Sequence, residues 1–259
     1  MLANYEAAKL QQRFIDKDLN RCFYESDLAD HTLSALEDRR AKEINDSIGT
    51  NGSSPQDLIV DLHTTTANMG ITLICESTPG NILIAGSVKV RCPHVKIYCF
   101  PTSSGIRSTI RSIAPYGIGI EIGPIPQNVL RHDIFQAMDQ VSRTILDVVH
   151  DINTDGLKED KLEVDAYEHV RHVSYPDHQT GGISLIHKDL QDKDYCALKQ
   201  GAPIFTNGNQ GIIIYEESKD LFPVFVNEAA YYEKNIAFSL TQKRKFSISL
   251  SGSDPVFFE

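Results

Sequence analysis

The sequence lacks an apolar run close to the roughly 20 residues that a membrane-spanning helix needs. Its start, MLANYEAAKLQQ, has no hydrophobic segment of the kind that a secretory signal contains. Positive charge is scarce, because 25 Lys and Arg face 35 Asp and Glu and leave a net charge of -10. With no basic surplus to meet phosphates, the sequence predicts neither a nucleic-acid partner nor a membrane partner.

Cysteine pairs are also missing. The five cysteines are an odd number with no Cys-x-x-Cys spacing, which predicts reduced, mostly buried thiols in a cytoplasmic protein. Length and composition are ordinary: 259 residues with 41% hydrophobic and 23% charged side chains can form one large α/β domain or two domains.

The first 155 residues read as an α/β domain. Helices are predicted at 27–48 and 131–153, where apolar residues recur at helical spacing. Four short runs rich in β-branched residues predict strands, two of them apolar enough to be buried on both faces as parallel strands are: 58–63, 71–76, 95–100 and 118–123.

The pattern changes after Asn153, where TDGLKED forms a polar link. Beyond it, short β-type runs separated by Gly and Pro predict a small antiparallel β domain. We therefore place a domain boundary near residue 155.

Chemistry-bearing side chains appear first in LIVDLHTTTANMG, residues 58–70. Asp61 and His63 are two apart on a predicted strand, so they share a face and emerge at its C-terminal end, where open α/β sheets place their sites. His63 is a candidate metal ligand, and Asp61 a carboxylate that could orient it. For a histidine taken alone, a hydrogen-bonded core residue is the commoner interpretation.

The segment RFIDKDLNR, residues 13–21, brings Arg13, Asn20 and Arg21 together. The planar forks of arginine suit the binding of carboxylates, although a solvated charged loop has the same composition.

A third segment, RSIAPYGIGIEIGPIPQ, covers residues 111–127 and opens on Arg111. Within it, Glu121 interrupts a strongly apolar strand, where a carboxylate needs a partner or a raised pKa. Glu121 is therefore a candidate general base, with a salt-bridged structural glutamate as the alternative.

Two segments of the β region complete the candidates. In PVFVNEAAYYEK, residues 223–234, the tyrosines 231 and 232 and Lys234 could close over a polar ligand or could alternate along an ordinary strand. In HVRH, His169 and His172 are three apart, which on a regular strand puts them on opposite faces and argues against a metal site.

Four of these segments resemble the motifs of the aspartoacylase family: RFIDKDLNR, LIVDLHTTTANMG, RSIAPYGIGIEIGPIPQ and PVFVNEAAYYEK. The resemblance includes LQDKDY at 190–195, and the segments follow one another along the chain in the order of the family's motifs. Members of this family are zinc amidohydrolases that split N-acetyl-L-aspartate into acetate and aspartate. The resemblance implies a zinc-carboxypeptidase-like α/β/α catalytic domain at 1–155, followed by a smaller antiparallel β domain at 156–259 that caps the site. It also implies one Zn²⁺, a small N-acyl amino acid as substrate and a homodimer.

The resemblance assigns roles by motif. His63 matches a zinc ligand, Glu121 the general base and acid, and Arg13 the group that helps polarise the scissile carbonyl. Zinc chemistry suits the reaction, because a bound Zn²⁺ polarises a poorly electrophilic amide and lowers the pKa of its water to about 7. The residues that match substrate-binding positions are Asn20, Arg21 and Tyr231 for the α-carboxylate, Arg111 for the side-chain carboxylate, and Lys234 near the entrance.

Two departures qualify this assignment. The family's other two zinc ligands belong to a Gly-x-x-His-Gly-x-Glu motif ahead of RFIDKDLNR, and the printed sequence does not contain that motif. We therefore expect either a truncated sequence or a protein that binds acyl amino acids or a partner without turnover. Arg107 replaces the usual tyrosine four residues before Arg111. An aminoacylase-3-like activity on N-acetyl aromatic amino acids or S-substituted cysteines remains the alternative within the family, and the cation at Arg111 argues against it.

Overall fold

A computed structural model describes the chain except for residues 105–107, 155–160, 177–183, 208–210 and 250–259. Within the described residues, the central sheet has seven strands in the order β1-β4-β2-β3-β5-β10-β9. Parallel pairing joins β1 to β4, β2 to β3 and β3 to β5, whereas β2 runs antiparallel to β4, and β10 antiparallel to β5 and β9. The strands are β1 (Leu58–Thr64), β2 (Gly70–Glu76), β3 (Lys96–Phe100), β4 (Tyr116–Gly123), β5 (Lys161–Ser174), β9 (Phe222–Val224) and β10 (Ile236–Ser249).

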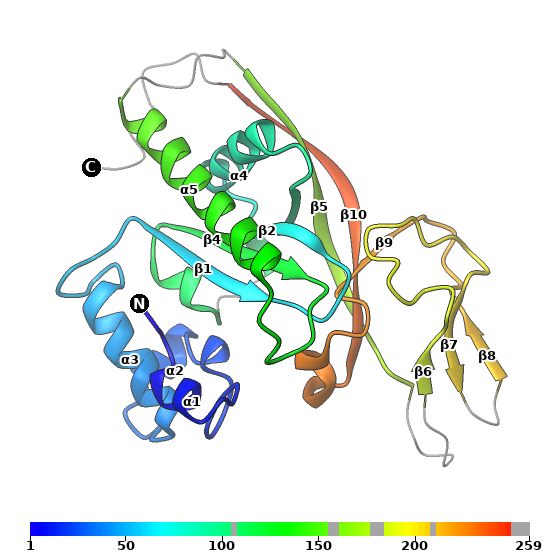
Figure 1. Cartoon of the computed structure of the whole chain (residues 1–259), viewed down its shortest axis with the longest axis horizontal. Coiled ribbons are helices and arrows are strands. Elements are labelled where there is room, and N and C mark those ends of the chain that lie inside the picture. The colour runs from blue at the N-terminus through cyan, green and yellow to red at the C-terminus, as the bar shows by residue number, and fades with distance from the viewer. Residues whose placement is uncertain (105–107, 155–160, 177–183, 208–210, 250–259) are drawn as a thin grey trace.

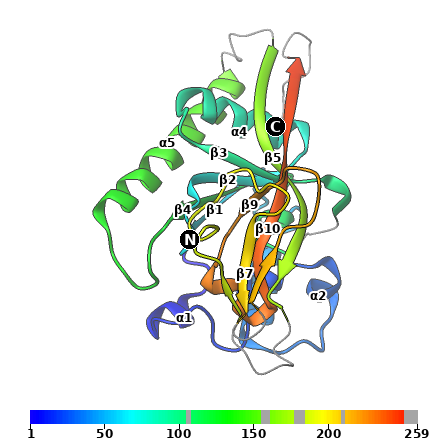
Figure 2. The same ribbon diagram turned by 90° about the vertical axis from the view of Figure 1, so that its right-hand side faces the viewer.

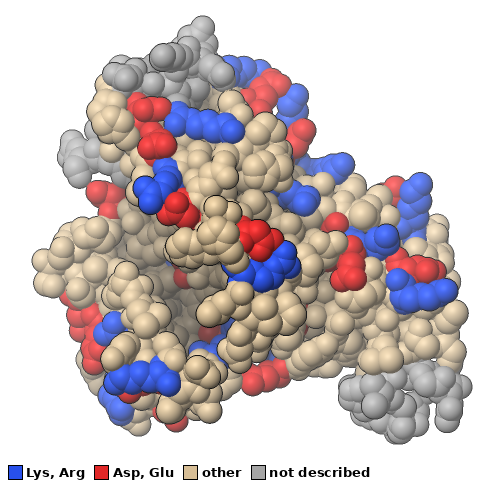
Figure 3. Space-filling view, in the orientation of Figure 1, with Lys and Arg blue, Asp and Glu red and all other residues tan. Residues whose placement is uncertain are grey.

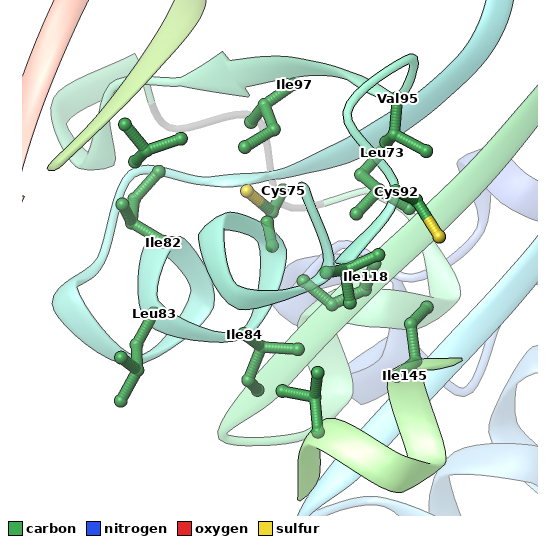
Figure 4. Close-up of a cluster of buried hydrophobic side chains, with 14 of the residues drawn as sticks. Leu73, Cys75, Ile82, Leu83, Ile84, Cys92, Val95, Ile97, Ile118 and Ile145 are labelled. Carbon is green, nitrogen blue, oxygen red and sulfur yellow. The ribbon is translucent and has the colours of Figure 1, made fainter. Parts of the chain in front are cut away.

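Two helices, α4 (Pro79–Arg91) and α5 (His132–Thr154), cover one face of this sheet (Figure 1). α4 begins after Thr78, whose side chain accepts a hydrogen bond from the Asn81 N–H, and no helix was predicted there. α5 confirms the prediction for 131–153. The main core lies between these helices and the strands, and Figure 4 shows its branched aliphatic residues converging: Leu73, Ile82, Ile84, Ile97, Ile118 and Ile145.

The opposite face of β1 receives the N-terminal segment, which contains α1 (Tyr5–Lys9), η1 (Leu19–Arg21), α2 (Glu25–Ala29) and α3 (Leu36–Ile48). The single helix predicted over 27–48 is wrong, because two helices occupy this stretch. Asp30 Oδ1 accepts hydrogen bonds from the backbone N–H and the hydroxyl of Thr32, at 2.8 and 2.7 Å. Such an Asx turn competes with helical hydrogen bonding and ends α2.

The C-terminal region contributes the long strands β5 and β10, which run side by side down the molecule in Figure 2. A separate three-stranded antiparallel sheet contains β6 (Ser184–Ile186), β7 (Pro203–Asn207) and β8 (Gly211–Ile214). The predicted class, α/β with a smaller antiparallel β part, is confirmed. The boundary near residue 155 stays a prediction, since β5 and β10 extend the central sheet. The short helices η2 (Thr102–Ser104), η3 (Ile110–Ile113) and η6 (Ala229–Lys234) complete the elements.

Surface properties agree with the composition. Four of the cysteines are buried and Cys196 is exposed, and all five are free thiols, as predicted. None of the helices in the described ranges combines the length and the apolar character needed to cross a membrane. On the face shown in Figure 3, basic side chains are interspersed with acidic ones.

Candidate active site

Strands β1 and β4 deliver the central pair of polar residues. They are parallel, and their register sets His63 beside Glu121, with side chains on the face away from α4 and α5. Asp61 lies on the same face of β1, as predicted, and its Oδ2 is 2.6 Å from Nε2 of His63. Neighbouring strands thus hold an imidazole between two carboxylates.

The charges around this pair shift its pKa values. Burial, opposed by His63 but assisted by Glu228 and Asp61, raises the pKa of Glu121 to about 7. Burial would lower the pKa of His63, but the hydrogen bond and charge of Asp61 outweigh it, so the pKa of His63 is raised. Glu121 is therefore a carboxyl group able to give or take a proton near neutral pH.

The loop 13–21 contacts β1 through Asn20 and carries two arginines that also line the cavity. Asn20 Nδ2 donates to Oδ2 of Asp61 at 3.0 Å, and Asn20 Oδ1 accepts from the Ile110 N–H at 2.9 Å. Arg13 pairs with Asp18 at 3.0 Å, while Arg21 Nη1 donates to the Asn20 carbonyl at 2.6 Å. The loop is therefore tied to the strand that carries His63.

A buried carboxylate fixes this loop from behind. Glu37, fully buried in the first turn of α3, accepts the backbone N–H groups of Ile15, Asp16 and Lys17 at 2.6, 3.1 and 3.2 Å, and Nδ2 of Asn4 at 3.0 Å. The sequence analysis did not single out Glu37. The helix predicted over 27–48 put Glu37 in its middle, where a glutamate is usually exposed, so no local signal pointed to its burial.

Arg111 reaches the cavity from η3. Its Nη1 donates to the Ile74 carbonyl on β2 at 2.8 Å. A Cβ atom on Gly119 would lie 3.3 Å from Nε of Arg111, so the glycine allows the guanidinium stem to lie against β4. Two strands thereby fix the direction of this cation.

The threonines after His63 hold a carboxylate from the far end of the chain. Glu228, 5% exposed, accepts hydrogen bonds from both hydroxyls of Thr65 and Thr66, from the Thr66 N–H at 2.8 Å and from the Ala67 N–H at 3.3 Å. Its other oxygen accepts the Ala230 N–H at 3.0 Å and caps η6, which carries Tyr231 and Lys234. Sequence reasoning missed Glu228, although a glutamate just before AAYY is a possible N-cap signal.

All eight predicted site residues line one cavity of about 480 Å³: Arg13, Asn20, Arg21, His63, Arg111, Glu121, Tyr231 and Lys234. Glu228, Tyr98, Phe100 and His172 also line it. The structure thus brings together segments that are up to 221 residues apart, and the roles of the individual residues stay predictions. Arg107 lies outside the described residues.

The donor atoms in this cavity do not fit a catalytic zinc. Such a site needs three protein ligands. His63 is the one imidazole beside Glu121, and its Nε2 is occupied by Asp61 and lies 3.2 Å from Nδ2 of Asn20. Across the part of the chain that the structure describes, no group of three or more His, Cys, Asp or Glu side chains could hold a metal ion.

The prediction that His169 and His172 face opposite sides of their strand is wrong. Arg171 pairs with Leu240 and His169 with Thr241, so one residue of β5, Val170, is extra and forms a β-bulge. The bulge restores both rings to one face, and their centroids are 4.7 Å apart. His172 lines the cavity.

Two stretches of the chain match models of known protein families. Residues 1–149 match the succinylglutamate desuccinylase/aspartoacylase catalytic domain, and residues 162–243 match the AstE/AspA barrel-sandwich hybrid domain. A probable aspartoacylase of Trichodesmium erythraeum is 40% identical over 252 residues, which cover 96% of this chain and 85% of the relative.

A human N-acyl-aromatic-L-amino acid amidohydrolase is 36% identical over 96% of this chain and 80% of its own length. The crystal structure of murine aminoacylase 3 superposes with a TM-score of 0.88 at 33% identity, over 96% of this chain and 84% of that one.

Proposed function

The chain belongs to the succinylglutamate desuccinylase/aspartoacylase family, and on that premise we propose that it is an amide-hydrolysing deacylase whose substrate is an N-acyl amino acid with an acidic side chain. N-acetyl-L-aspartate, which carries two carboxylates and gives acetate and aspartate on hydrolysis, is the substrate that we favour.

One observation carries this proposal: four cations line a single cavity of a chain whose net charge is -10. Arg13, Arg21, Arg111 and Lys234 create a local positive region that can attract and hold a dianion despite the overall charge. Of these, Arg13 has a carboxylate partner within the loop, Asp18. A ligand with two carboxylates would satisfy the others.

We assign the residues to separate parts of the reaction. Asn20, Arg21 and Tyr231 would hold the α-carboxylate, and Arg111 the side-chain carboxylate. Glu121 would accept a proton from the attacking water and return it to the leaving nitrogen. Arg13 would stabilise the negative charge that develops on the amide oxygen.

A second activity, removal of acyl groups from aromatic amino acids, has a specific observation in its favour. Tyr98, Phe100 and Phe225 line the same cavity and offer apolar surface. Against it, an apolar side chain beside Arg111 would displace water from the guanidinium and offer it no hydrogen-bond acceptor in return, which costs free energy. The acidic substrate therefore remains our first choice.

The role of zinc ligand stays a prediction for His63 and rests on the family resemblance alone. No reaction step is assigned to a metal, because a catalytic zinc needs three protein ligands and the described residues contain no group of three His, Cys, Asp or Glu side chains that could hold one. The third alternative, binding of acyl amino acids without turnover, follows from the same donor set. The homodimer stays a prediction.

Calorimetric binding tests the substrate class independently of turnover. N-acetyl-L-aspartate and N-acetyl-L-phenylalanine are titrated into the wild type and into Arg111→Ala. Loss of one charge-assisted contact, about 1.5–3 kcal/mol, should weaken binding of the aspartate derivative roughly ten- to a hundredfold. Binding of the phenylalanine derivative should change little. The control is Arg131→Ala, which removes an exposed arginine paired with Asp133 outside the cavity. Equal losses for both ligands would contradict the assignment of Arg111.

A further inference from the structure

The cavity has a wall that the proposed roles leave unused. We propose that His172 is an anion-binding residue at the mouth of this cavity, and that it takes up a proton as a dianionic N-acyl amino acid binds. The inference rests on the proposed function and deepens it, because it makes selectivity for dianionic over monoanionic ligands depend on pH.

The bulge in β5 places His172 there. With Val170 as the extra residue, Ser239 pairs with His172 and Thr241 with His169, so both imidazoles lie on the face that the cavity opens onto. Ser239 Oγ is 2.9 Å from Nδ1 of His172 and fixes the ring plane. A strand without the bulge would turn one of the two rings to the other face of the sheet.

The second ring supports the first from behind. His169 Nδ1 is 2.8 Å from the Tyr98 hydroxyl, and its ring lies 4.9 Å from that of Phe100 and 4.7 Å from that of His172. Burial and the neighbouring His172 lower the pKa of His169 to about 4. His169 therefore stays neutral near pH 7, and His172 is the member of the pair that can gain charge when a ligand binds.

The groups facing His172 from each surrounding element decide when it does so. Lys234 approaches from η6, Arg21 from η1, Ser239 from β10, and His169 from the same strand. Burial against the cavity wall and the positive charges of Lys234 and Arg21 lower the pKa of His172. A carboxylate bound among Arg21, Lys234 and His172 reverses the sign of that field, so the imidazolium becomes favourable only in the complex.

Ligand charge then controls proton uptake. A dianion opposes the repulsion from Arg21 and Lys234 more strongly than a monoanion of similar size. We expect bound N-acetyl-L-aspartate to raise the pKa of His172 by about one pH unit. Such a rise corresponds to roughly tenfold stronger binding at pH values below the titration of His172 than at pH values above it. Bound N-acetyl-L-alanine, with one carboxylate, should have a smaller effect.

NMR titration of the histidine ring signals measures this directly. The His172 signal is identified by its loss in His172→Gln, and its pKa is recorded without ligand, with N-acetyl-L-aspartate and with N-acetyl-L-alanine. Calorimetry from pH 8 to pH 5.5 gives the affinities in parallel. His172→Lys carries a permanent charge and should bind the dianion tightly with a weaker dependence on pH than the wild type. His150→Gln, at an exposed histidine of α5 that does not line the cavity, is the control and should keep the wild-type pH dependence.

A rise in the pKa of His172 that is larger with the dianion, together with a reduced pH dependence in His172→Lys, supports the proposal. If both ligands bind but leave the pKa of His172 unchanged, or if His150→Gln removes the pH dependence as fully as His172→Gln, the inference is overturned and the proposed function stands. If neither ligand binds at millimolar concentration, both fail together.

Discussion

Glu228 joins the segment after β1 to η6 on the other side of the cavity, and its substitution tests how much this link stabilises the protein. Glu228 is 5% exposed. Its carboxylate accepts hydrogen bonds from the backbone N–H groups of Thr66, Ala67 and Ala230 and from two threonine hydroxyls. In Glu228→Ala the hydroxyls can turn to other acceptors, whereas the three N–H groups are fixed by the backbone. Those of Thr66 and Ala230 should remain without partners, whereas the Ala67 N–H also donates to Thr65 Oγ1 at 3.1 Å.

The magnitude follows from these two unsatisfied donors and from the loss of a buried charge. A buried donor left unsatisfied costs about 1–3 kcal/mol, and a broken buried charged network costs about 3–5 kcal/mol in total. We therefore expect Glu228→Ala to lower the free energy of unfolding by about 3–5 kcal/mol, a large part of the roughly 5–15 kcal/mol typical of whole domains. Because η6 loses its cap, Tyr231 should also lose its fixed position, and N-acetyl-L-aspartate should bind more weakly.

Urea unfolding followed by circular dichroism measures the effect, since the chain has no tryptophan to report by fluorescence. Glu228→Gln keeps the shape and one acceptor oxygen and should lose less stability than Glu228→Ala. Glu233→Ala, an exposed glutamate on the same short helix, is the matched control and should stay within about 0.5 kcal/mol of the wild type. If Glu228→Ala is as stable as Glu233→Ala, the role given to this carboxylate is wrong.

Two further predictions concern the metal and the loop 13–21. The 259-residue chain should purify with far less than one zinc per chain by mass spectrometric metal analysis, because the described residues lack a three-ligand site. Tightly held stoichiometric zinc would refute this. Four hydrogen bonds hold the pKa of Glu37 below its usual range, although burial alone would raise it. A carboxyl group whose pKa is lower in the folded than in the unfolded state stabilises the fold at pH values above its unfolded pKa of about 4.3. That stabilisation is lost as the pH falls through the folded-state pKa. Glu37→Gln should therefore destabilise the protein at pH 7 by chemical denaturation, with a difference from the wild type that shrinks below about pH 4; a difference independent of pH would contradict the argument.

Much of the architecture followed from local periodicity. The strands predicted at 58–63, 71–76, 95–100 and 118–123 correspond to β1, β2, β3 and β4 within two residues at each end. The helix at 131–153 shows its apolar stripe at helical spacing. By contrast, α4 was not predicted, because it is buried along most of its length and carries no polar face to produce an amphipathic pattern.

The sequence by itself determined which residues could act at a site. Their types, and the position of His63 at the end of an apolar strand, are local properties that spacing and side-chain chemistry express. Only the tertiary structure decided how they meet. The bulge that turns His172 into the cavity depends on pairing with β10, and the hydrogen bonds of Glu228 to Thr65 and Thr66 join residues 163 and 162 positions apart. The burial of Glu37 depends likewise on the loop that folds over α3. Such contacts have no period along the chain, because they arise when distant segments pack together and each buried polar group must find a partner.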